Sequence, residues 1–187
     1  MSTSGKPETV DRDGRSWRLG GAETVAWIAR NCRVGLTITS AIPPCFDRYA
    51  TITDMEDFGS AQELLASQRR LVEILRQHGS TEWWLGYLDT GAGDLVFPGA
   101  PKLSLYAGWR YVVVQAGPEQ ALRWRESLPD LMFPIDRAWC LSTLWDDSWS
   151  CLGGPSDLMQ QLESNPLIEL HQVEVEADAT PPGHVAF

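Results

Sequence analysis

The sequence is poor in the residues on which metal and redox sites depend. It has three scattered histidines and four cysteines, Cys32, Cys45, Cys140 and Cys151, without a C-x-x-C spacing. Zinc ribbons and dithiol redox sites bring such residues together at short spacings. We therefore expect neither a metal centre nor a bound cofactor.

Long apolar runs are also missing. No stretch approaches the roughly 20 uninterrupted apolar residues that span a bilayer, and the segment MSTSGKPETVDRDGRSW has no apolar signal-peptide core. We expect a cytoplasmic protein that is neither secreted nor in contact with a membrane.

Basic side chains are nearly absent from the last third of the chain. The net charge of −10 divides into −1 over residues 1–129, with 15 acidic and 14 basic residues, and −9 over residues 130–187, where ten acidic residues stand against Arg137. A region of one sign attracts basic partners and repels phosphate backbones. We expect a basic protein as the partner and no direct nucleic-acid contact, although such a surface can also serve solubility alone.

What the sequence does contain is enough apolar material for a core. The chain has 187 residues, 43% of them hydrophobic, with nine tryptophans. That length fits one domain better than two. We expect a disordered N-terminal arm over residues 1–20, a single domain over 21–176 and a flexible tail over 177–187.

Hydrophobic periodicity predicts the elements of this domain. Helical spacing marks residues 21–35 and 60–79, the second with Ser60 and Glu63 as a capping box. Strand patterns mark 36–42, 82–89 and 166–176, and residues 102–117 resemble a hairpin that turns at 107–109. EWWLGYLD, residues 82–89, is apolar on both alternating faces and is expected as a central strand.

A strand-turn-strand-helix pattern occurs twice. LYAGWRYVVVQAGPEQALRW and LWDDSWSCLGGPSDLMQQL align at an offset of 37 residues, each with a Gly-Pro step before its helix, where proline is well tolerated. Duplication and convergent geometry both explain the recurrence. Because hairpins join most of the strands, we predict an α+β fold with a mainly antiparallel sheet built from ββα units and helices packed on it.

The second copy carries the most distinctive residues. If Asp146 and Asp147 are the central residues of its hairpin, Leu144 lies opposite Trp149, and Ser142 lies opposite Cys151. Alternation then separates two faces of the sheet. One carries Cys140, Leu144, Trp149 and Cys151, and the other carries Trp139, Leu141, Thr143, Trp145 and Leu152.

Three stretches resemble a group of uncharacterised bacterial proteins of similar size. These are EWWLGYLDTG, YAGWRYVVVQAGPEQALRWR and LSTLWDDSWSCLGGP, within a likeness that covers residues 22–175. The resemblance implies a bacterial, cytoplasmic origin and transfers no site residue. The 13 arginines against two lysines are compatible with a GC-rich genome. In class alone, a small acidic tryptophan-rich α+β protein is similar to bacterial immunity proteins, which neutralise a toxin by covering it.

The leading hypothesis is a non-enzymatic acidic protein-binding module, of which an immunity-type inhibitor of a basic protein is one form. Aromatic residues flanked by charge anchor many interfaces. The candidate partner-binding residues are Trp145, Asp146, Asp147, Trp149 and Asp157.

Several other functions stay open. A small cysteine-dependent enzyme would use Cys151 as nucleophile and His171 as base, with the amides of Gly153 and Gly154 holding an oxyanion. Against it, Cys151 on an apolar face is a structural cysteine. A small-molecule-binding protein with a tryptophan-lined pocket and a subunit of a larger assembly are further alternatives. Adjacent aspartates at a turn point apart and do not form an acid–base pair.

Overall fold

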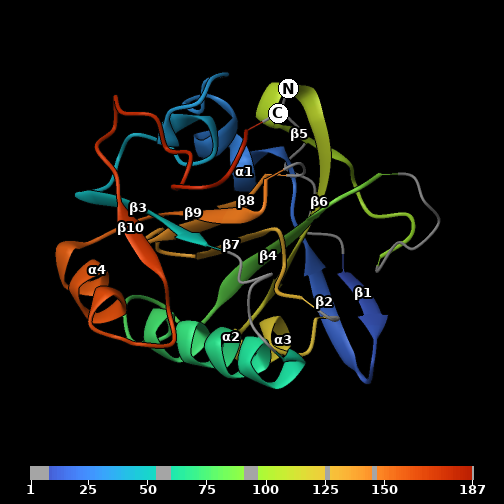
Figure 1. Cartoon of the computed structure of the whole chain (residues 1–187). Helices are drawn as coiled ribbons and strands as arrows, with labels where there is room; N and C mark the ends of the chain where they lie inside the picture. Colours follow the sequence, from blue (N-terminus) through green and yellow to red (C-terminus); the bar gives the residue numbers. More distant parts are fainter. Residues whose placement is uncertain (1–8, 54–59, 91–96, 125–126, 145–146, 187) are drawn as a thin grey trace.

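The computed structural model describes residues 9–53, 60–90, 97–124, 127–144 and 147–186. They form an α+β fold in which every strand pairing is antiparallel (Figure 1). The ten-stranded sheet has the order β1-β2-β6-β4-β7-β8-β9-β3-β10, and β5 pairs with β6 beside this path. The predicted fold class is confirmed.

The elements have the following bounds. The strands are β1 (Thr9–Arg12), β2 (Arg15–Leu19), β3 (Arg48–Thr53), β4 (Trp83–Leu88), β5 (Leu103–Leu105), β6 (Trp109–Ala116), β7 (Leu131–Pro134), β8 (Cys140–Thr143), β9 (Trp149–Gly154) and β10 (Leu170–Gln172). The α-helices are α1 (Ala22–Ala29), α2 (Ala61–Leu75), α3 (Pro118–Ala121) and α4 (Ser156–Glu163), and 3-10 turns cover Ile38–Ser40 and Tyr106–Gly108.

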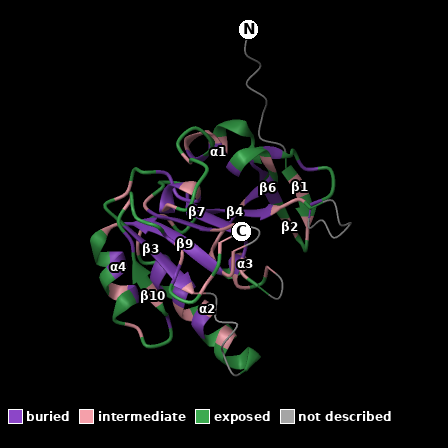
Figure 2. Ribbon diagram, turned by 45° about the horizontal axis from the view of Figure 1, so that its top comes forward, coloured by how far each residue is buried: buried purple, intermediate pink, exposed green. Residues whose placement is uncertain are grey.

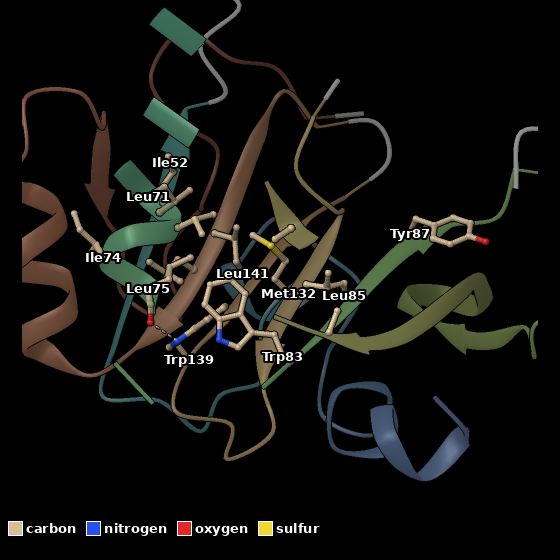
Figure 3. Packing of buried hydrophobic residues seen from close by; sticks show 14 of the residues in the cluster. Ile52, Leu71, Ile74, Leu75, Trp83, Leu85, Tyr87, Met132, Trp139 and Leu141 are labelled. Carbon is tan, nitrogen blue, oxygen red and sulfur yellow. Dashed lines mark hydrogen bonds between the residues drawn. The ribbon is translucent and has the colours of Figure 1, made fainter. Parts of the chain in front are cut away.

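The sheet separates two apolar layers. Helices α2, α3 and α4 cover one face, where Trp83 and Trp139 meet edge to face at 4.8 Å between ring centroids (Figure 3). Helix α1, the turn at Ile38–Ser40 and the segment after β10 cover the other face (Figure 1). The central strands are buried between these layers, and the outward sides of the helices are exposed (Figure 2).

The strongest sequence patterns are confirmed. Strand β4 is central, paired with β6 and β7 and covered on both faces. Helix α2 begins after Ser60, whose hydroxyl accepts a hydrogen bond from the Glu63 amide at 3.3 Å. Pro118 is the first residue of α3, whereas Pro155 is the N-cap of α4, one position earlier than expected.

Two local predictions need correction. Residues 36–42 were expected as a strand, but Ile38–Ser40 form a 3-10 turn, and the amide of Ile42 donates to the carbonyl of Ile38 at 2.9 Å. The turn lets Ile38, Ala41 and Ile42 all pack on the same face, which a strand does not allow. The turn of the first hairpin lies at Tyr106–Gly108, one residue earlier than predicted.

The chain ends also differ from expectation where they are described. Residues 9–19, expected within a disordered arm, form β1 and β2, because Trp17 and Leu19 alternate on β2 and are buried in the core. In the expected tail, Ala179 is buried, and its amide donates to the carbonyl of Leu36 at 2.8 Å. Within the described part of the chain, no helix is long and apolar enough to cross a membrane.

Candidate functional site

The second hairpin has the register that its sequence predicts. Cys140 pairs with Gly153, Leu141 with Leu152 and Ser142 with Cys151. Cys140, Trp149 and Cys151 accordingly lie in the layer beside α1, and Trp139, Leu141 and Leu152 lie in the layer beside α2. Of the candidate anchors at the hairpin tip, Asp147 and Trp149 are described, whereas Trp145 and Asp146 lie outside the described residues.

A pocket of about 180 Å³ opens on the face that carries Trp149. Four segments far apart in the sequence form its wall: residues 33–36, the turn near 106–109, the hairpin of β8 and β9, and the C-terminal segment. We call it the Trp149 pocket. Its wall is formed by Arg33, Val34, Gly35, Leu36, Ser40, Tyr106, Ala107, Trp109, Leu144, Asp147, Trp149, Cys151, Ala179, Thr180 and Ala186.

Exposed apolar side chains gather at this pocket. Val34 is 86% exposed, Val185 65% and Leu36 55%, the three highest values among the large apolar residues that the structure describes. Val34 and Leu36 line the pocket, and Val185 directly precedes Ala186, which also lines it. Scattered exposed apolar residues are ordinary, but a group around one concave site is typical of a binding surface.

The C-terminal segment is held against the hairpin by a histidine. The Nδ1 atom of His184 lies 2.7 Å from the hydroxyl oxygen of Ser148, and its ring meets Trp149 edge to face at 5.6 Å between centroids. The bond from Ala179 to Leu36 fixes the other end of the same segment. The pocket is therefore a composite of the β8–β9 hairpin, residues 33–36, residues 106–109 and residues 179–186.

Acidic side chains extend from this pocket toward β10. Glu169, Glu174, Glu176 and Asp178 are all exposed, and they lie along β10 and the segment that leads to Ala179. The Thr180 amide donates to the Asp178 carboxylate at 2.8 Å, which lowers the pKa of that carboxyl and keeps it ionised. The acidic band and the apolar pocket thus follow one continuous stretch of chain.

Asp157 is not brought to this site. It lies in the first turn of α4, which packs on the other face of the sheet through Leu158, Met159 and Leu162. Its carboxylate is 3.6 Å from the Nδ1 atom of His78 and is largely exposed. Asp157 therefore lies apart from Trp149, and its part in partner binding stays a prediction.

The geometry also separates Cys151 from His171. His171 pairs with Thr51 of β3, and Thr51 pairs with Cys151, so a whole strand stands between the proposed nucleophile and its base. Two interstrand spacings amount to roughly 9.5 Å. The hydroxyl of Thr51 is buried and has no hydrogen-bond partner within the described structure.

The environment of Cys151 is unsuited to a thiolate. Burial, and secondly the nearby Asp147, raise the pKa of its thiol well above the ordinary range. Helix α4 lies on the opposite face of the sheet, so its N-terminus does not act on this thiol. Gly153 and Gly154 lie in a strand that pairs on both sides, with β3 and β8. Cys151 packs in the apolar layer beside α1 and contributes to the wall of the Trp149 pocket.

Sequence reasoning missed several members of the pocket. Val34 and Leu36 were assigned to a helix end and a strand, and residues 178–186 were expected as a tail. The only local signals for these segments were the apolar residues Val34 and Leu36 in RVGL and the turn-forming residues in TPPGH, residues 180–184. Neither shows which distant segment it meets.

Comparison with known proteins finds no matching family model, no matching curated protein and no matching solved structure. Within the described ranges, no group of three or more histidine, cysteine or acidic side chains is arranged to hold a metal ion.

Proposed function

We propose that this protein is a non-enzymatic binding module, of the kind represented by immunity-type inhibitors, and that it covers a basic protein with the face around the Trp149 pocket. The observation that supports the proposal is that the highly exposed Val34 and Leu36 line one concave site, with the exposed Val185 next to the lining residue Ala186. Protein interfaces typically have an apolar centre and a polar rim.

The charge around the pocket favours a basic partner. Arg33 and Asp147 balance one another in the pocket wall, so the pocket itself suits an apolar anchor of the partner. The adjoining band of Glu169, Glu174, Glu176 and Asp178 carries the charge. Such a band speeds association with a surface of opposite sign and aligns the two proteins.

A matched pair of variants tests the location of this surface. Leu36→Ser removes an apolar side chain at the pocket, and Leu65→Ser removes a similarly exposed leucine, 48% exposed, from α2 on the other face. A basic protein captured by the wild type from source-cell lysate should be lost with Leu36→Ser and retained with Leu65→Ser. Equal capture by both variants would place the interface elsewhere.

The electrostatic part has its own test. Binding to the captured and purified partner should weaken sharply between about 0.05 and 0.5 M salt, because screening shortens over that range. Affinity that does not change with salt would contradict a role for the acidic band and leave the apolar anchor as the whole interaction. Inhibition of the partner's activity by the purified protein would distinguish an inhibitor from a scaffold.

A second candidate is a small-molecule-binding protein. Trp109 and Trp149 both line the pocket, and flat aromatic walls suit an apolar or aromatic ligand. Tryptophan fluorescence monitored against a library of small aromatic compounds would separate the two candidates. Saturable quenching that Trp149→Phe abolishes would favour the small ligand, and its absence would favour the protein partner.

A further inference from the structure

A second pocket, of about 260 Å³, lies on the other face of the sheet from the Trp149 pocket. It is bounded by α2, by strands β3, β8 and β9, and by the segment that leads into β7. Ile52, Leu71 and Leu141 lie between α2 and the sheet in Figure 3, and they form part of its wall. The other lining residues are Thr53, Leu64, Ser67, Gln68, Ser127, Leu128, Pro129, Asp130, Thr143 and Ser150. We call it the Asp130 pocket.

Asp130 is a carboxylate in an unusual place. One of its oxygens accepts a hydrogen bond from the Leu88 amide at 2.8 Å, at the end of β4. Within the described structure, no lysine or arginine nitrogen forms an ion pair with Asp130. Lys102 forms an ion pair with Asp89. Burial raises the pKa of this carboxyl. Asp130 is partly buried, and a desolvated carboxylate without a cation is destabilising, so sites of this kind are frequently functional.

Other polar groups line the same pocket. Ser67 on α2 is 8% exposed and lines the pocket. The hydroxyls of Thr143 and Ser150 lie 2.7 Å apart, and Gln68 lies one residue beyond Ser67 on α2. The pocket is also lined by aliphatic side chains, those of Ile52, Leu64, Leu71, Leu128 and Leu141. The pocket thus combines an acidic residue, polar side chains and aliphatic side chains in one lining.

We propose that the Asp130 pocket binds a small aliphatic amine, with the ammonium group at Asp130 and the hydrocarbon chain among the leucines. An ammonium group supplies a positive charge and N–H donors, which the Asp130 carboxylate can accept. An anion is disfavoured by Asp130 and by the net charge of −10, and a purely apolar molecule leaves the carboxylate without a partner. The site is separate from the Trp149 pocket, so it does not depend on the function proposed above.

One substitution separates binding from structure. Asp130→Asn keeps an oxygen that can accept the Leu88 amide hydrogen bond but removes the negative charge. If Asp130 had only a structural role, this variant would respond to the ligand in the same way as the wild type. Glu73→Gln is the matched control, because it removes an exposed carboxylate from α2 outside the pocket.

The test is an NMR titration of the full chain with n-butylammonium chloride, with 1-butanol and sodium butyrate as probes of the same length. We expect saturable shifts at Ser67, Leu71 and Thr143 with butylammonium, and binding about tenfold weaker in Asp130→Asn, since a charge-assisted hydrogen bond is lost. Butanol should bind both proteins equally weakly, and butyrate should not bind.

The following results would overturn the proposal. They are no saturable response to butylammonium in the millimolar range, equal affinity for wild type and Asp130→Asn, and shifts that map outside the pocket. A loss in Glu73→Gln equal to that in Asp130→Asn would also overturn it, because it would show a general charge effect. Thermal melts of each variant establish that the compared proteins are folded.

Discussion

The hydroxyl of Ser148 lies 2.7 Å from the Nδ1 atom of His184, and this contact attaches the C-terminal segment to the tip of the hairpin of β8 and β9. The two residues are 36 positions apart in the sequence. Because Asp147 and Trp149 flank Ser148, and Ala186 lies two residues after His184, the contact closes one side of the Trp149 pocket.

Replacing His184 by alanine should loosen that closure. We expect a loss of about 1 kcal/mol in the free energy of unfolding, the usual value of one hydrogen bond, and a red shift of tryptophan emission as Trp149 gains water. Urea denaturation and fluorescence measure both. His171→Ala is the control, since His171 is exposed on the edge strand. Equal effects of the two substitutions would contradict the role given to His184.

The four thiols should differ in reactivity in the order of their exposure. Cys45 is exposed, whereas burial holds the pKa of Cys151 and Cys140 well above the ordinary thiol range. We expect iodoacetamide near neutral pH to modify Cys45 first and the two strand cysteines only as the protein unfolds. Mass spectrometry of peptides at successive times measures this order. Fastest labelling at Cys151 would revive the cysteine-enzyme hypothesis.

Gly153 cannot accept a side chain without a shift of its neighbours. A Cβ atom there would lie 2.4 Å from Cδ2 of Phe46 and 2.6 Å from Cγ2 of Ile42. Gly153→Ala should therefore lower the free energy of unfolding by about 1–3 kcal/mol through overpacking. Gly21→Ser is a control, because a Cβ atom added at Gly21 would have no atom within 4 Å, and serine is a favourable N-cap residue. A Gly153→Ala protein as stable as the control would show that Phe46 moves freely.

Asp130→Asn should stabilise the unliganded protein near pH 7. The folded-state pKa of Asp130 is raised above its ordinary value of 3.8, so ionisation opposes folding once the pH exceeds that raised pKa. The advantage of asparagine should shrink as the pH falls through that range, because aspartic acid then becomes neutral too. Melting temperatures of both proteins between pH 3.5 and 7, buffered without amines, measure it. A variant less stable at pH 7 would indicate that the carboxylate has a favourable partner.

Both pockets contain residues that do not favour the stability of the isolated chain. The desolvated carboxylate of Asp130 and the exposed Val34 and Leu36 are all unfavourable for an isolated folded chain. Proteins commonly retain such features where binding offsets them. That shared character is the physical reason why we propose binding at these two pockets.

Local pattern was sufficient for much of the fold. The pairing of Ser142 with Cys151 was predicted from an assumed two-residue turn at positions 146 and 147 and a side-chain period of two, and the structure has this pairing. Because both faces of the sheet are buried, a slip of one residue would be costly. Strand β4 follows from a run that is apolar on both faces, and α2 from its capping box and helical spacing. In these elements local preference and burial agree.

Which residues meet at the Trp149 pocket depends on the tertiary structure alone. Val34, Trp109, Trp149 and Ala179 come from four segments with no shared periodicity, and they meet because the sheet order brings distant strands under one layer. The C-terminal segment has little intrinsic structure and is ordered by contacts to Leu36 and Ser148. Asp157, near Trp149 in sequence, points away because α4 crosses to the other face. The sequence by itself determined strands, register and charge, whereas the meeting of side chains depended on long-range packing, which no local pattern encodes.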